Sequence, residues 1–553
     1  MSDHNQNRDM SFDIPPIVQQ LLASRGVNTP EDIKRFLYPD FMSELHDPLA
    51  MLDMDKAVAR IVQAIEQREN VVIYGDYDID GITATALLVS AFELWGLPVT
   101  SYIPDRFEEG YGINQDALVG LKAAGAELVI SVDCGITSVA EAEWAQQHGL
   151  DLVITDHHSP PERTPEAIAV VNPKREGDEY PFKELAGVGV AYKLVQAVAQ
   201  GLGRPDAGQL KWLLDLVALG TVCDVVTLTG ENRALVYFGL KVLRQTRRVG
   251  LRALAEVAGI DITTIRSSHL GFGLGPRLNA AGRLEHAALS LELVLTTDEL
   301  KAQSIAQMLD NLNQQRRSDQ ASIVEGALVQ AQTFVADPVV VLAHEAWSHG
   351  IVGIAAAKVV EQVGKPVLVA QILGDHTKGS ARSVPGFNIV EALRARPDLF
   401  IKFGGHAYAA GFTIATNRLN ELRNHLNAYW RQNLPADLDL TNRGDIQLDS
   451  VGMIDGKLMA ALQMLEPFGN GNPEPVIELQ KIQLVDTKLM GSNRQHVRGT
   501  LRDLESARLP LVAFGWGDRL DELAQATTLI GTLNQNDWRG VTTVQFVARR
   551  IRA

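Results

Sequence analysis

Short apolar runs that alternate with helical patterns mark the first half of the chain. The runs cover residues 71–74, 128–132 and 152–155, and each has the length and β-branched content of a buried parallel strand. Residues 82–95 and 137–148, which lie between the runs, carry apolar positions at helical spacing. The order strand, helix, strand, helix predicts an α/β fold built on a parallel sheet.

The rest of the sequence divides where this pattern changes. We expect a polar N-terminal cap over 1–54, an α/β domain with a Leu-rich helical extension over 55–300, a connecting helix over 300–335, and a second αβ domain over 336–435. Within the helical extension, the glycine-rich stretch 271–283 is expected to form a loop.

The last part of the chain, residues 436–553, predicts a linker and an all-β domain. Gly, Asn and Pro residues at 467–473 require turns, and short alternating runs follow them. About five strands of this kind are consistent with an OB-fold. The clearest runs are 483–485, 496–501, 510–514 and 541–547.

Composition places the protein among soluble, multidomain proteins. A chain of 553 residues exceeds a single hydrophobic core, and its 46% hydrophobic content is ordinary for a globular protein. No apolar run is long enough to cross a bilayer, and the polar start MSDHNQNRDM is not typical of a signal peptide. We therefore expect a cytoplasmic protein that does not bind membranes.

The net charge of −16 predicts weak non-specific binding to nucleic acid without excluding it. Residues 476–553 hold 11 Lys or Arg against 8 Asp or Glu, so the C-terminal part has a positive balance. An acidic outer surface would restrict a nucleic acid to a few basic channels.

Acidic residues follow the predicted strands and give the sequence its chemistry. The stretch GDYDIDG at 75–81 follows the first strand, Asp133 follows the second, and Asp156-His157-His158 follows the third. Functional groups of parallel sheets gather beyond the carboxyl ends of the strands, so these side chains should converge. Their oxygens suit a hard divalent cation, Mg²⁺ or Mn²⁺, whereas an isolated motif of this kind would also fit a solvated acidic turn. Asp224, after the apolar helical stretch 212–219, is a further candidate.

The chain has two cysteines, Cys134 and Cys223, and each is adjacent to one of these acids. Both thiols are candidate soft metal ligands. Without a CxxC partner, however, we expect small buried hydrophobic residues in a reducing compartment.

Several motifs together carry a family resemblance. GDYDIDG, SVDCG (131–135), TDHH (155–158) and GTVCDVV (220–226) resemble the DHH phosphoesterase superfamily. The further motifs resemble the bacterial RecJ type, a single-strand-specific 5′→3′ DNA exonuclease: YIPDRFEEGYG (102–112), GFGLGPRLNAAGR (271–283), GSARS (379–383), KFGGHAYAAGF (402–412) and PFGNGNPEP (467–475).

The resemblance implies a fold and an activity. The fold is α/β, with a DHH catalytic domain and a DHH-associated domain joined by a long helix, plus a C-terminal all-β OB-fold. The activity is metal-dependent hydrolysis of single-stranded DNA from its 5′ end, which releases 5′-mononucleotides in DNA repair and recombination. Single-stranded DNA is the implied partner of a monomeric enzyme, and a single-stranded-DNA-binding protein and a helicase are further candidate partners.

The resemblance also implies a site with two Mn²⁺ or Mg²⁺ ions. Asp80 or Asp133 would bridge the ions, and the imidazole ligand favours Mn²⁺. Asp76 would complete the shell of the second ion or orient a ligand. His158 is assigned either a role at the leaving group or behind the ligands, or direct ligation or packing. The implied ligands are Asp78, Asp80, Asp133, His157 and Asp224.

Phosphate recognition is expected from glycine and arginine motifs. Exposed backbone N–H groups, a hydroxyl and guanidinium forks suit phosphate oxygens, although each arginine taken alone fits a structural ion pair equally well. The candidates are Arg106, Arg277, Asn279, Arg283, Ser380, Arg382, Gly404, Gly405 and His406. Tyr111, Phe514 and Trp516 are weaker candidates for base stacking, because aromatic residues are mostly core residues.

Two other functions remain open at this stage. One is a DHH phosphodiesterase of short RNA or cyclic dinucleotides, which the extra β domain disfavours because such enzymes are usually shorter. The other is a non-catalytic replication scaffold of the same fold, which would be expected to lack carboxylates that this sequence retains.

Overall fold

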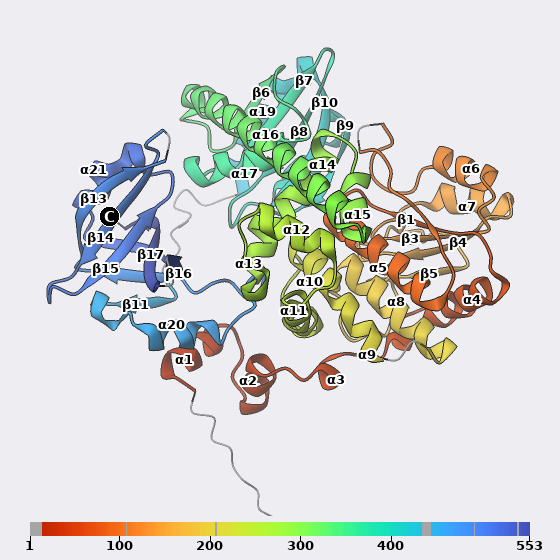
Figure 1. Ribbon diagram of the computed structural model, residues 1–553. Helices are drawn as coiled ribbons and strands as arrows, with labels where there is room; N and C mark the ends of the chain where they lie inside the picture. The colour runs from red at the N-terminus through yellow and green to blue at the C-terminus, as the bar shows by residue number, and fades with distance from the viewer. Residues whose placement is uncertain are drawn as a thin grey trace, which may run out of the picture.

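A computed structural model describes residues 14–106, 108–204, 207–433, 444–491, 493–538 and 541–552 (Figure 1). The first 13 residues of the predicted cap and residues 436–443 of the predicted linker lie outside this range. No helix within it is both long and apolar enough to cross a membrane.

The first domain contains the predicted parallel sheet. The strands follow the order β2-β1-β3-β4-β5, and all neighbours run parallel. The three predicted strands are β1, β3 and β4, and two three-residue edge strands add to them. Their bounds are Val71–Gly75 for β1, Thr100–Tyr102 for β2, Leu128–Val132 for β3, Asp151–Thr155 for β4 and Ala169–Val171 for β5.

Helices cover both faces of this sheet, which explains why its strands are continuously apolar. Val71 and Ile73 of β1 belong to the core shared with helices α4 (Met54–Gln67), α5 (Ile79–Trp95) and α8 (Gly187–Leu202). Val72 and Tyr74 point the other way, into the core shared with α6 (Gln115–Ala123) and α7 (Val139–Gln147). The parallel order places the ends of β1, β3 and β4, with the acids that follow them, at one edge of the sheet.

A helical extension continues the first domain and leads into the connecting helix α16 (Glu299–Ala331). The predicted loop at 271–283 is wrong, because a π-helical turn over Leu270–Leu274 runs directly into α14 (Gly275–Leu284). A Cβ atom at Gly275 would lie 2.7 Å from the sulfur of Cys223, so this glycine serves close helix packing rather than a loop. The other helices of the extension are α9 (Ala207–Leu210), α10 (Leu214–Cys223), α11 (Gly230–Leu243), α12 (Val249–Val257), α13 (Ser267–His269) and α15 (Ala288–Leu295).

The second αβ domain has a mixed sheet in the order β6-β7-β8-β10-β9, in which only β6 and β7 are parallel. Helix α17 (Val352–Val363) packs with α16 on one face. Helices α18 (Ile389–Arg394) and α19 (Leu419–Asn433) cover the other. The strands are β6 (Val340–His344), β7 (Val367–Leu373), β8 (His376–Arg382), β9 (Phe400–His406) and β10 (Ala409–Ala415).

The C-terminal domain is a seven-stranded sheet in the order β11-β12-β16-β17-β15-β14-β13, larger than the five strands expected. The four predicted runs lie in β13, β14, β15 and β17. In sequence, helix α20 (Gly456–Gln463) lies between β11 and β12, and helix α21 (Leu520–Gln525) lies between β15 and β16. The strands are β11 (Ile446–Leu448), β12 (Ile477–Gln480), β13 (Gln483–Met490), β14 (His496–Arg502), β15 (Arg508–Ala513), β16 (Thr528–Trp538) and β17 (Val541–Ile551).

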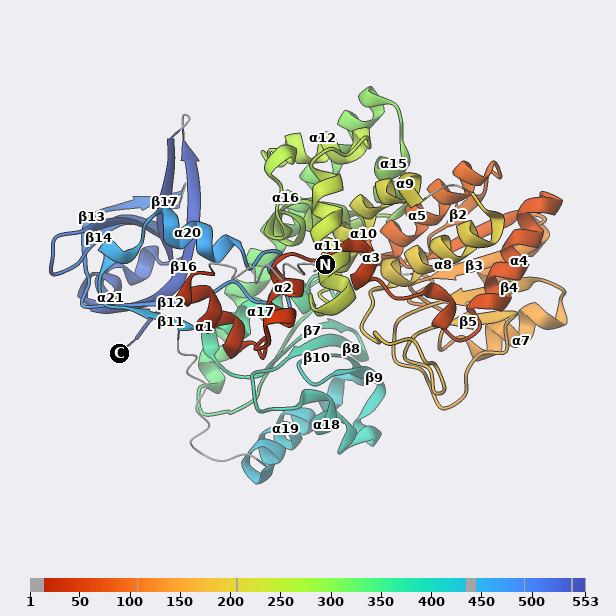
Figure 2. The same ribbon diagram turned by 90° about the horizontal axis from the view of Figure 1, so that it is seen from below.

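The N-terminal segment packs against both the C-terminal domain and the first domain. Val18 and Leu22 of α1 (Pro16–Ser24) and Leu37 of α2 (Pro30–Leu37) are buried in the core of the C-terminal domain. Figure 2 shows α1 beside β11 and β12, while α3 (Phe41–Glu44) lies against the first domain. The expected cap is therefore a strap between two domains, because its apolar residues complete a core formed more than 400 residues later.

Candidate metal centre and substrate cavity

The turn between β1 and α5 presents three carboxylates from five residues. Asp78 caps α5 by accepting hydrogen bonds from the backbone N–H groups of Asp80 (2.9 Å) and Gly81 (3.2 Å). This cap fixes the turn. Asp76 and Asp80, two residues before and two residues after Asp78, are both buried.

The carboxylate of Asp80 is held by the N-terminus of another helix, α8. It accepts hydrogen bonds from the backbone N–H groups of Gly187 (2.6 Å) and Val188 (2.8 Å). The positive end of a helix dipole stabilises this negative charge. Residue 187 must be glycine, because a Cβ atom there would lie 2.5 Å from Oδ1 of Asp133.

His157 stands at the centre of the remaining acids. Its Nε2 lies 3.2 Å from Oδ1 of Asp133 and 3.6 Å from Oδ2 of Asp224. Its distance to Oδ2 of Asp80 is 3.8 Å. Among the described residues, three overlapping groups have ligand atoms within 4.8 Å of one another: Asp76–Asp78–Asp133, Asp80–His157–Asp224 and Asp133–His157–His158.

The donor atoms of this cluster fit divalent cations. Oδ1 of Asp76, Oδ1 of Asp133, Oδ2 of Asp224 and Nε2 of His157 are buried and have no hydrogen-bond partner among the described residues. Buried acceptors without a partner are costly unless a cation or a donor satisfies them. Carboxylate oxygens with one imidazole are ligands that Mn²⁺ and Mg²⁺ accept.

Burial favours the neutral forms of Asp80, Asp224 and His157. Burial, reinforced by the charge of Asp78, raises the pKa of Asp80 to about 7. Burial and the neighbouring charges of Asp80 and Asp78 raise the pKa of Asp224 to about 9. Burial lowers the pKa of His157 to about 3, so this imidazole is neutral and able to ligate.

Asp156 organises the histidine pair from behind. Its Oδ1 lies 2.8 Å from Nδ1 of His158, and its Oδ2 accepts a hydrogen bond from the Ile136 N–H (2.9 Å). The hydroxyl of Tyr111 lies 3.0 Å from the same Nδ1 of His158. Against the opposing effect of burial, the hydrogen bond to Asp156 raises the pKa of His158 above its ordinary value, and the ring is 39% exposed at the rim.

Comparisons with known proteins cover most of the chain. Three family profiles cover successive parts of the chain: the DHH family, N-terminal domain, over 70–221, the DHHA1 domain over 336–432 and the RecJ OB domain over 445–550. The single-stranded-DNA-specific exonuclease RecJ of Dickeya dadantii is 35% identical over 97% of this chain and 96% of its own length. This chain belongs to the RecJ family.

Other RecJ proteins agree with this placement. The Bacillus subtilis single-stranded-DNA-specific exonuclease RecJ is 39% identical over 95% of this chain, which spans 66% of the length of that relative. The crystal structure of Thermus thermophilus RecJ in complex with Mn²⁺ superposes with a TM-score of 0.80 at 30% identity, covering 98% of this chain and 76% of that one.

A cluster of guanidinium groups lies beside the candidate metal ligands. Burial and the nearby charges of Arg106, Arg316 and Arg382 lower the pKa of Arg283 to about 10. The guanidinium of Arg106 lies 4.9 Å from the ring of Tyr77, next to Asp76 and Asp78. Ser380 and Arg382 both approach the N-terminal turn of α17, where a Cβ atom at Gly353 would lie 3.1 Å from Oγ of Ser380 and 3.4 Å from Arg382.

The glycine motif aligns with these residues across the second sheet. Gly411 of β10 pairs with Ser380 on one side and Gly404 on the other. Ala409 likewise pairs with Arg382 and His406. Gly404 and Gly411 have no described atom within 4 Å of the position of a Cβ, so the backbone between them is open to a ligand. Gly405 has a φ of +145°.

Other candidates lie in different settings. Arg277 forms an ion pair with Asp310 at 2.8 Å, and its part in substrate binding stays a prediction. Trp516 is buried in the core of the C-terminal domain, whereas Phe514 is 59% exposed. Both cysteines are outside the groups of ligand atoms found among the described residues, and Cys134 is fully buried.

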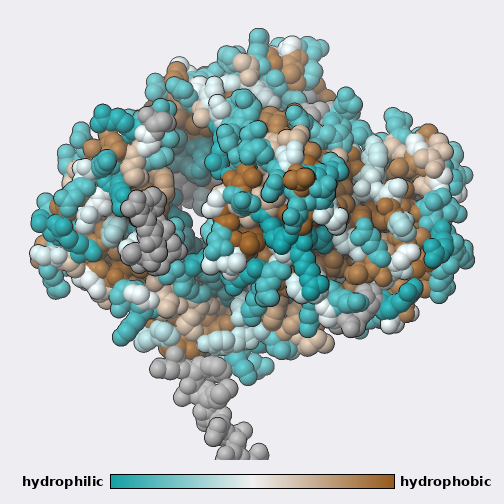
Figure 3. Space-filling model, in the orientation of Figure 1, coloured by the Kyte–Doolittle hydropathy of each residue, from teal (hydrophilic) through white to brown (hydrophobic). Residues whose placement is uncertain are grey.

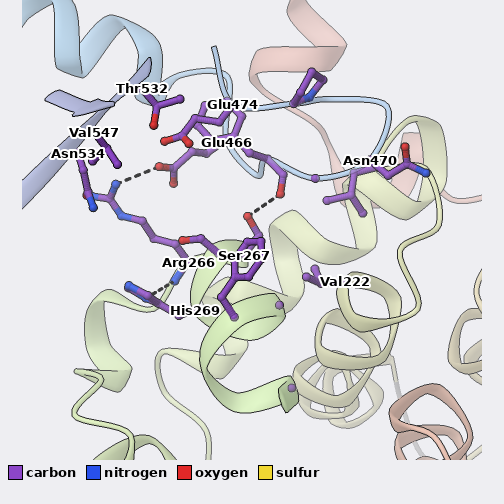
Figure 4. A pocket seen from close by; sticks show the side chains of 18 of the residues that line it. Val222, Arg266, Ser267, His269, Glu466, Asn470, Glu474, Thr532, Asn534 and Val547 are labelled. Carbon is purple, nitrogen blue, oxygen red and sulfur yellow. Dashed lines mark hydrogen bonds and ion pairs between the residues drawn. The ribbon is translucent and has the colours of Figure 1, made fainter. Parts of the chain in front are cut away.

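A cavity of about 1370 Å³ lies between the helical extension and the C-terminal domain, and its lining includes Ile79 and Cys223, which adjoin the candidate ligands Asp78, Asp80 and Asp224 in sequence. Ile79, Asn279, Arg283 and Arg316 line it at one end, and β16 and β17 line it at the other. Figure 3 shows the hollow between the C-terminal domain and the helical extension. Arg266 and Glu466, which both line the cavity, form an ion pair at 3.1 Å (Figure 4).

Sequence reasoning missed three contributors. In the sequence Asp156 only defines a motif, Gly187 follows no apolar run, and Arg316 lies in a stretch whose pattern predicts a connecting helix alone. The small residues Ala186-Gly187-Val188-Gly189 were a usable signal for close approach of the backbone to a buried anion.

Proposed function

We propose that the protein is a divalent-metal-dependent exonuclease specific for single-stranded DNA, which removes 5′-mononucleotides from the 5′ end. The observation that carries the proposal is the set of buried carboxylate and imidazole atoms without partners among the described residues, next to a cluster of guanidinium groups. RecJ relatives that match most of the chain bear the name single-stranded-DNA-specific exonuclease.

In this proposal two Mn²⁺ or Mg²⁺ ions are held by Asp76, Asp78, Asp80, Asp133, His157 and Asp224. Bound cations of this kind polarise a phosphoryl oxygen and make a water molecule more acidic. Asp133 belongs to two of the three ligand groups and, unlike His157, has two oxygen atoms to offer, so it would be the ligand able to contact both ions, and Asp80 is oriented by α8.

We assign to His158 the donation of a proton to the leaving 3′-oxygen. It stands at the rim of the cluster, partly exposed, and its raised pKa favours the protonated ring. Asp156 orients the ring and stabilises its positive charge, as a carboxylate behind a catalytic histidine does.

The direction of digestion is assigned to the guanidinium cluster. A terminal 5′-phosphate carries more charge than an internal phosphate, and Arg106, Arg283 and Arg382 offer forked donors to it. Ser380 and the backbone near Gly404 lie in the same row of the sheet. Capture of the terminal phosphate here would place the next phosphate at the metal cluster.

We infer that the enzyme acts as a monomer in the cytoplasm. All proposed ligands come from one chain, and the two free thiols fit a reducing compartment. A substrate restricted to single strands requires an enzyme that separates duplexes, so a helicase and a single-stranded-DNA-binding protein are the proposed protein partners.

The test is digestion of oligonucleotides labelled at the 5′ or the 3′ end. We expect a 5′-labelled single strand to give labelled mononucleotide at once in Mn²⁺ or Mg²⁺, and no product in chelator or from blunt duplex. Early release of the 3′ label would contradict the polarity. Equal cleavage of short RNA or of cyclic dinucleotides would favour a different DHH phosphodiesterase.

A further inference from the structure

One loop of the C-terminal domain lies against the segment that carries Asp224. The loop covers residues 467–476, between α20 and β12. The side-chain amide of Asn470 donates a hydrogen bond to the carbonyl oxygen of Val225 (2.9 Å), and the N–H of Leu228 donates one to the carbonyl oxygen of Asn470 (2.7 Å). Figure 4 shows Asn470 on this loop beside the ribbon of the first domain.

Two glycines show that this contact is built into the fold. A Cβ atom at Gly469 would lie 2.5 Å from the side chain of Leu228. Gly471 has a φ of +74°, and its Cβ position is 3.3 Å from Thr227 and Thr229. The loop therefore approaches residues 227–229 more closely than other amino acids at these positions would allow.

Val225 occupies a strained conformation directly after the candidate metal ligand. Its φ is +64°, in the left-handed region that β-branched residues rarely adopt. The side chain is 65% exposed, so burial of the valine does not hold this conformation. The hydrogen bond from Asn470 to its carbonyl oxygen acts directly on the strained residue.

The same loop is anchored on its other side to the C-terminal domain and the strap. Arg549 of β17 forms an ion pair with Glu474 (3.0 Å). Arg25 of the N-terminal strap donates a hydrogen bond to the carbonyl oxygen of Pro473 (2.7 Å). The loop thus contacts the backbone of residues 225–228 on one side and the C-terminal domain and the strap on the other.

We propose that Asn470 is a positioning residue for Asp224, and that docking of the 467–476 loop sets the metal affinity of the centre. Loss of the hydrogen bond releases Val225 from its left-handed conformation and turns Asp224 away from His157. The inference rests on the proposed function, which assigns Asp224 to the metal centre.

The test measures Mn²⁺ binding to metal-free full-length protein by calorimetry, with thermal unfolding of the same samples. We expect Asn470→Ala, and the similarly shaped Asn470→Leu, to weaken Mn²⁺ binding by about 10-fold or more, as loss of a residue behind a ligand does. The melting temperature of the metal-free protein should remain unchanged. Activity at saturating Mn²⁺ should recover, because the loss is in metal binding.

Two further variants separate positioning from a general loss of structure. Asn70→Ala is the matched control, because Asn70 is also an exposed asparagine whose amide donates to a backbone carbonyl oxygen, that of Gly125 (3.2 Å). Its Mn²⁺ affinity should equal that of the wild type. Val225→Gly combined with Asn470→Ala should restore most of the affinity, since glycine adopts the left-handed conformation without strain.

The outcomes distinguish this inference from the proposed function. Wild-type Mn²⁺ affinity in both Asn470 variants, or a weakened affinity that Val225→Gly does not restore, would overturn the positioning role. Asp224→Asn is the reference: it should lose Mn²⁺ binding. Undiminished binding by Asp224→Asn would instead remove Asp224 from the metal centre.

Discussion

The two αβ domains present their functional groups in opposite ways. In the first, helices cover both faces of a parallel sheet, and most of the acids at its carboxyl edge are almost fully buried. In the second, a mixed sheet exposes the backbone around Gly404 and Gly411. Burial suits groups that hold dehydrated cations, whereas a strand end that arrives from solvent needs an open surface.

The two regions also differ in charge. The first gathers carboxylates that lack partners within the described part of the chain, and the second contributes a guanidinium to a cluster that lowers the pKa of Arg283. Each cluster is electrostatically unfavourable alone, and in the proposed function a ligand of opposite charge would offset this, a cation in one and a phosphate in the other. Variants in each region should therefore have separable effects.

The largest effect is expected from Asp133→Asn, which keeps the shape of the side chain and removes its charge. Because Asp133 belongs to two ligand groups, kcat/KM in Mn²⁺ should fall by about 1000-fold or more, since the metal-derived stabilisation is worth several kcal/mol. Affinity for a 5′-phosphorylated strand should persist. Asp116→Asn, in the exposed first turn of α6, is the control and should retain full activity. Near-normal turnover by Asp133→Asn would show that the ligand set is misassigned.

A smaller effect, specific to one chain end, is expected from Arg382→Ala. Loss of charged hydrogen bonds should weaken binding of a 5′-phosphorylated strand by about 1.5 to 3 kcal/mol, and of a 5′-hydroxyl strand by less. Binding is measured in Ca²⁺ or with a non-hydrolysable strand. Arg418→Ala removes an arginine of the same domain, paired with Asp398 and Glu421, and should change neither. An equal loss on both strands would argue against capture of the terminal phosphate.

Local pattern is sufficient to predict the three central strands of the first sheet and the convergence of their acids, but not the short edge strands β2 and β5. Asp76, Asp78, Asp133 and His157 follow apolar runs, and parallel topology alone brings such residues to one edge. The strap was not predictable, because its buried leucines complete a core whose other side chains lie more than 400 residues away. The contact between Asn470 and the backbone after Asp224 is missed for the same reason. The turn pattern at 467–473 indicates a loop but says nothing of the backbone that the loop touches.

Asp156→Asn should reduce activity by about 10- to 100-fold, the usual cost of losing a carboxylate that orients the groups around a metal centre. The amide of the variant side chain could still accept from the Ile136 N–H through its oxygen, but it would no longer stabilise a protonated His158. The effect should therefore grow with pH in the variant, as the pKa of His158 falls. The pH profile of kcat at saturating Mn²⁺ checks this. A uniform loss at all pH values would mean that Asp156 serves the fold alone.

The smallest expected effect is a pH-dependent gap in stability between metal-free and Mn²⁺-loaded protein. In the metal-free state the pKa of Asp80 is about 7 and that of Asp224 about 9, both above the unfolded value of about 3.9. At pH values between the unfolded pKa and these raised pKa values, the native state binds more protons than the unfolded state, so stability falls as pH rises. The raised pKa of His158 acts in the same direction, because its stabilising contribution is lost as pH rises through that pKa.

We therefore expect the melting temperature of the metal-free protein to decline from pH 6 to pH 9, while the Mn²⁺-loaded protein changes less. Bound cations favour the ionised carboxylates and remove the penalty that rising pH imposes on the buried acids. Asp224→Asn, which lacks one of the titrating groups, should show a shallower decline without metal. A metal-free melting temperature that stays constant or rises over this range would show that the acids are already ionised and stabilised by the protein, and the contrast between a cation-dependent buried cluster and an open phosphate surface would no longer hold.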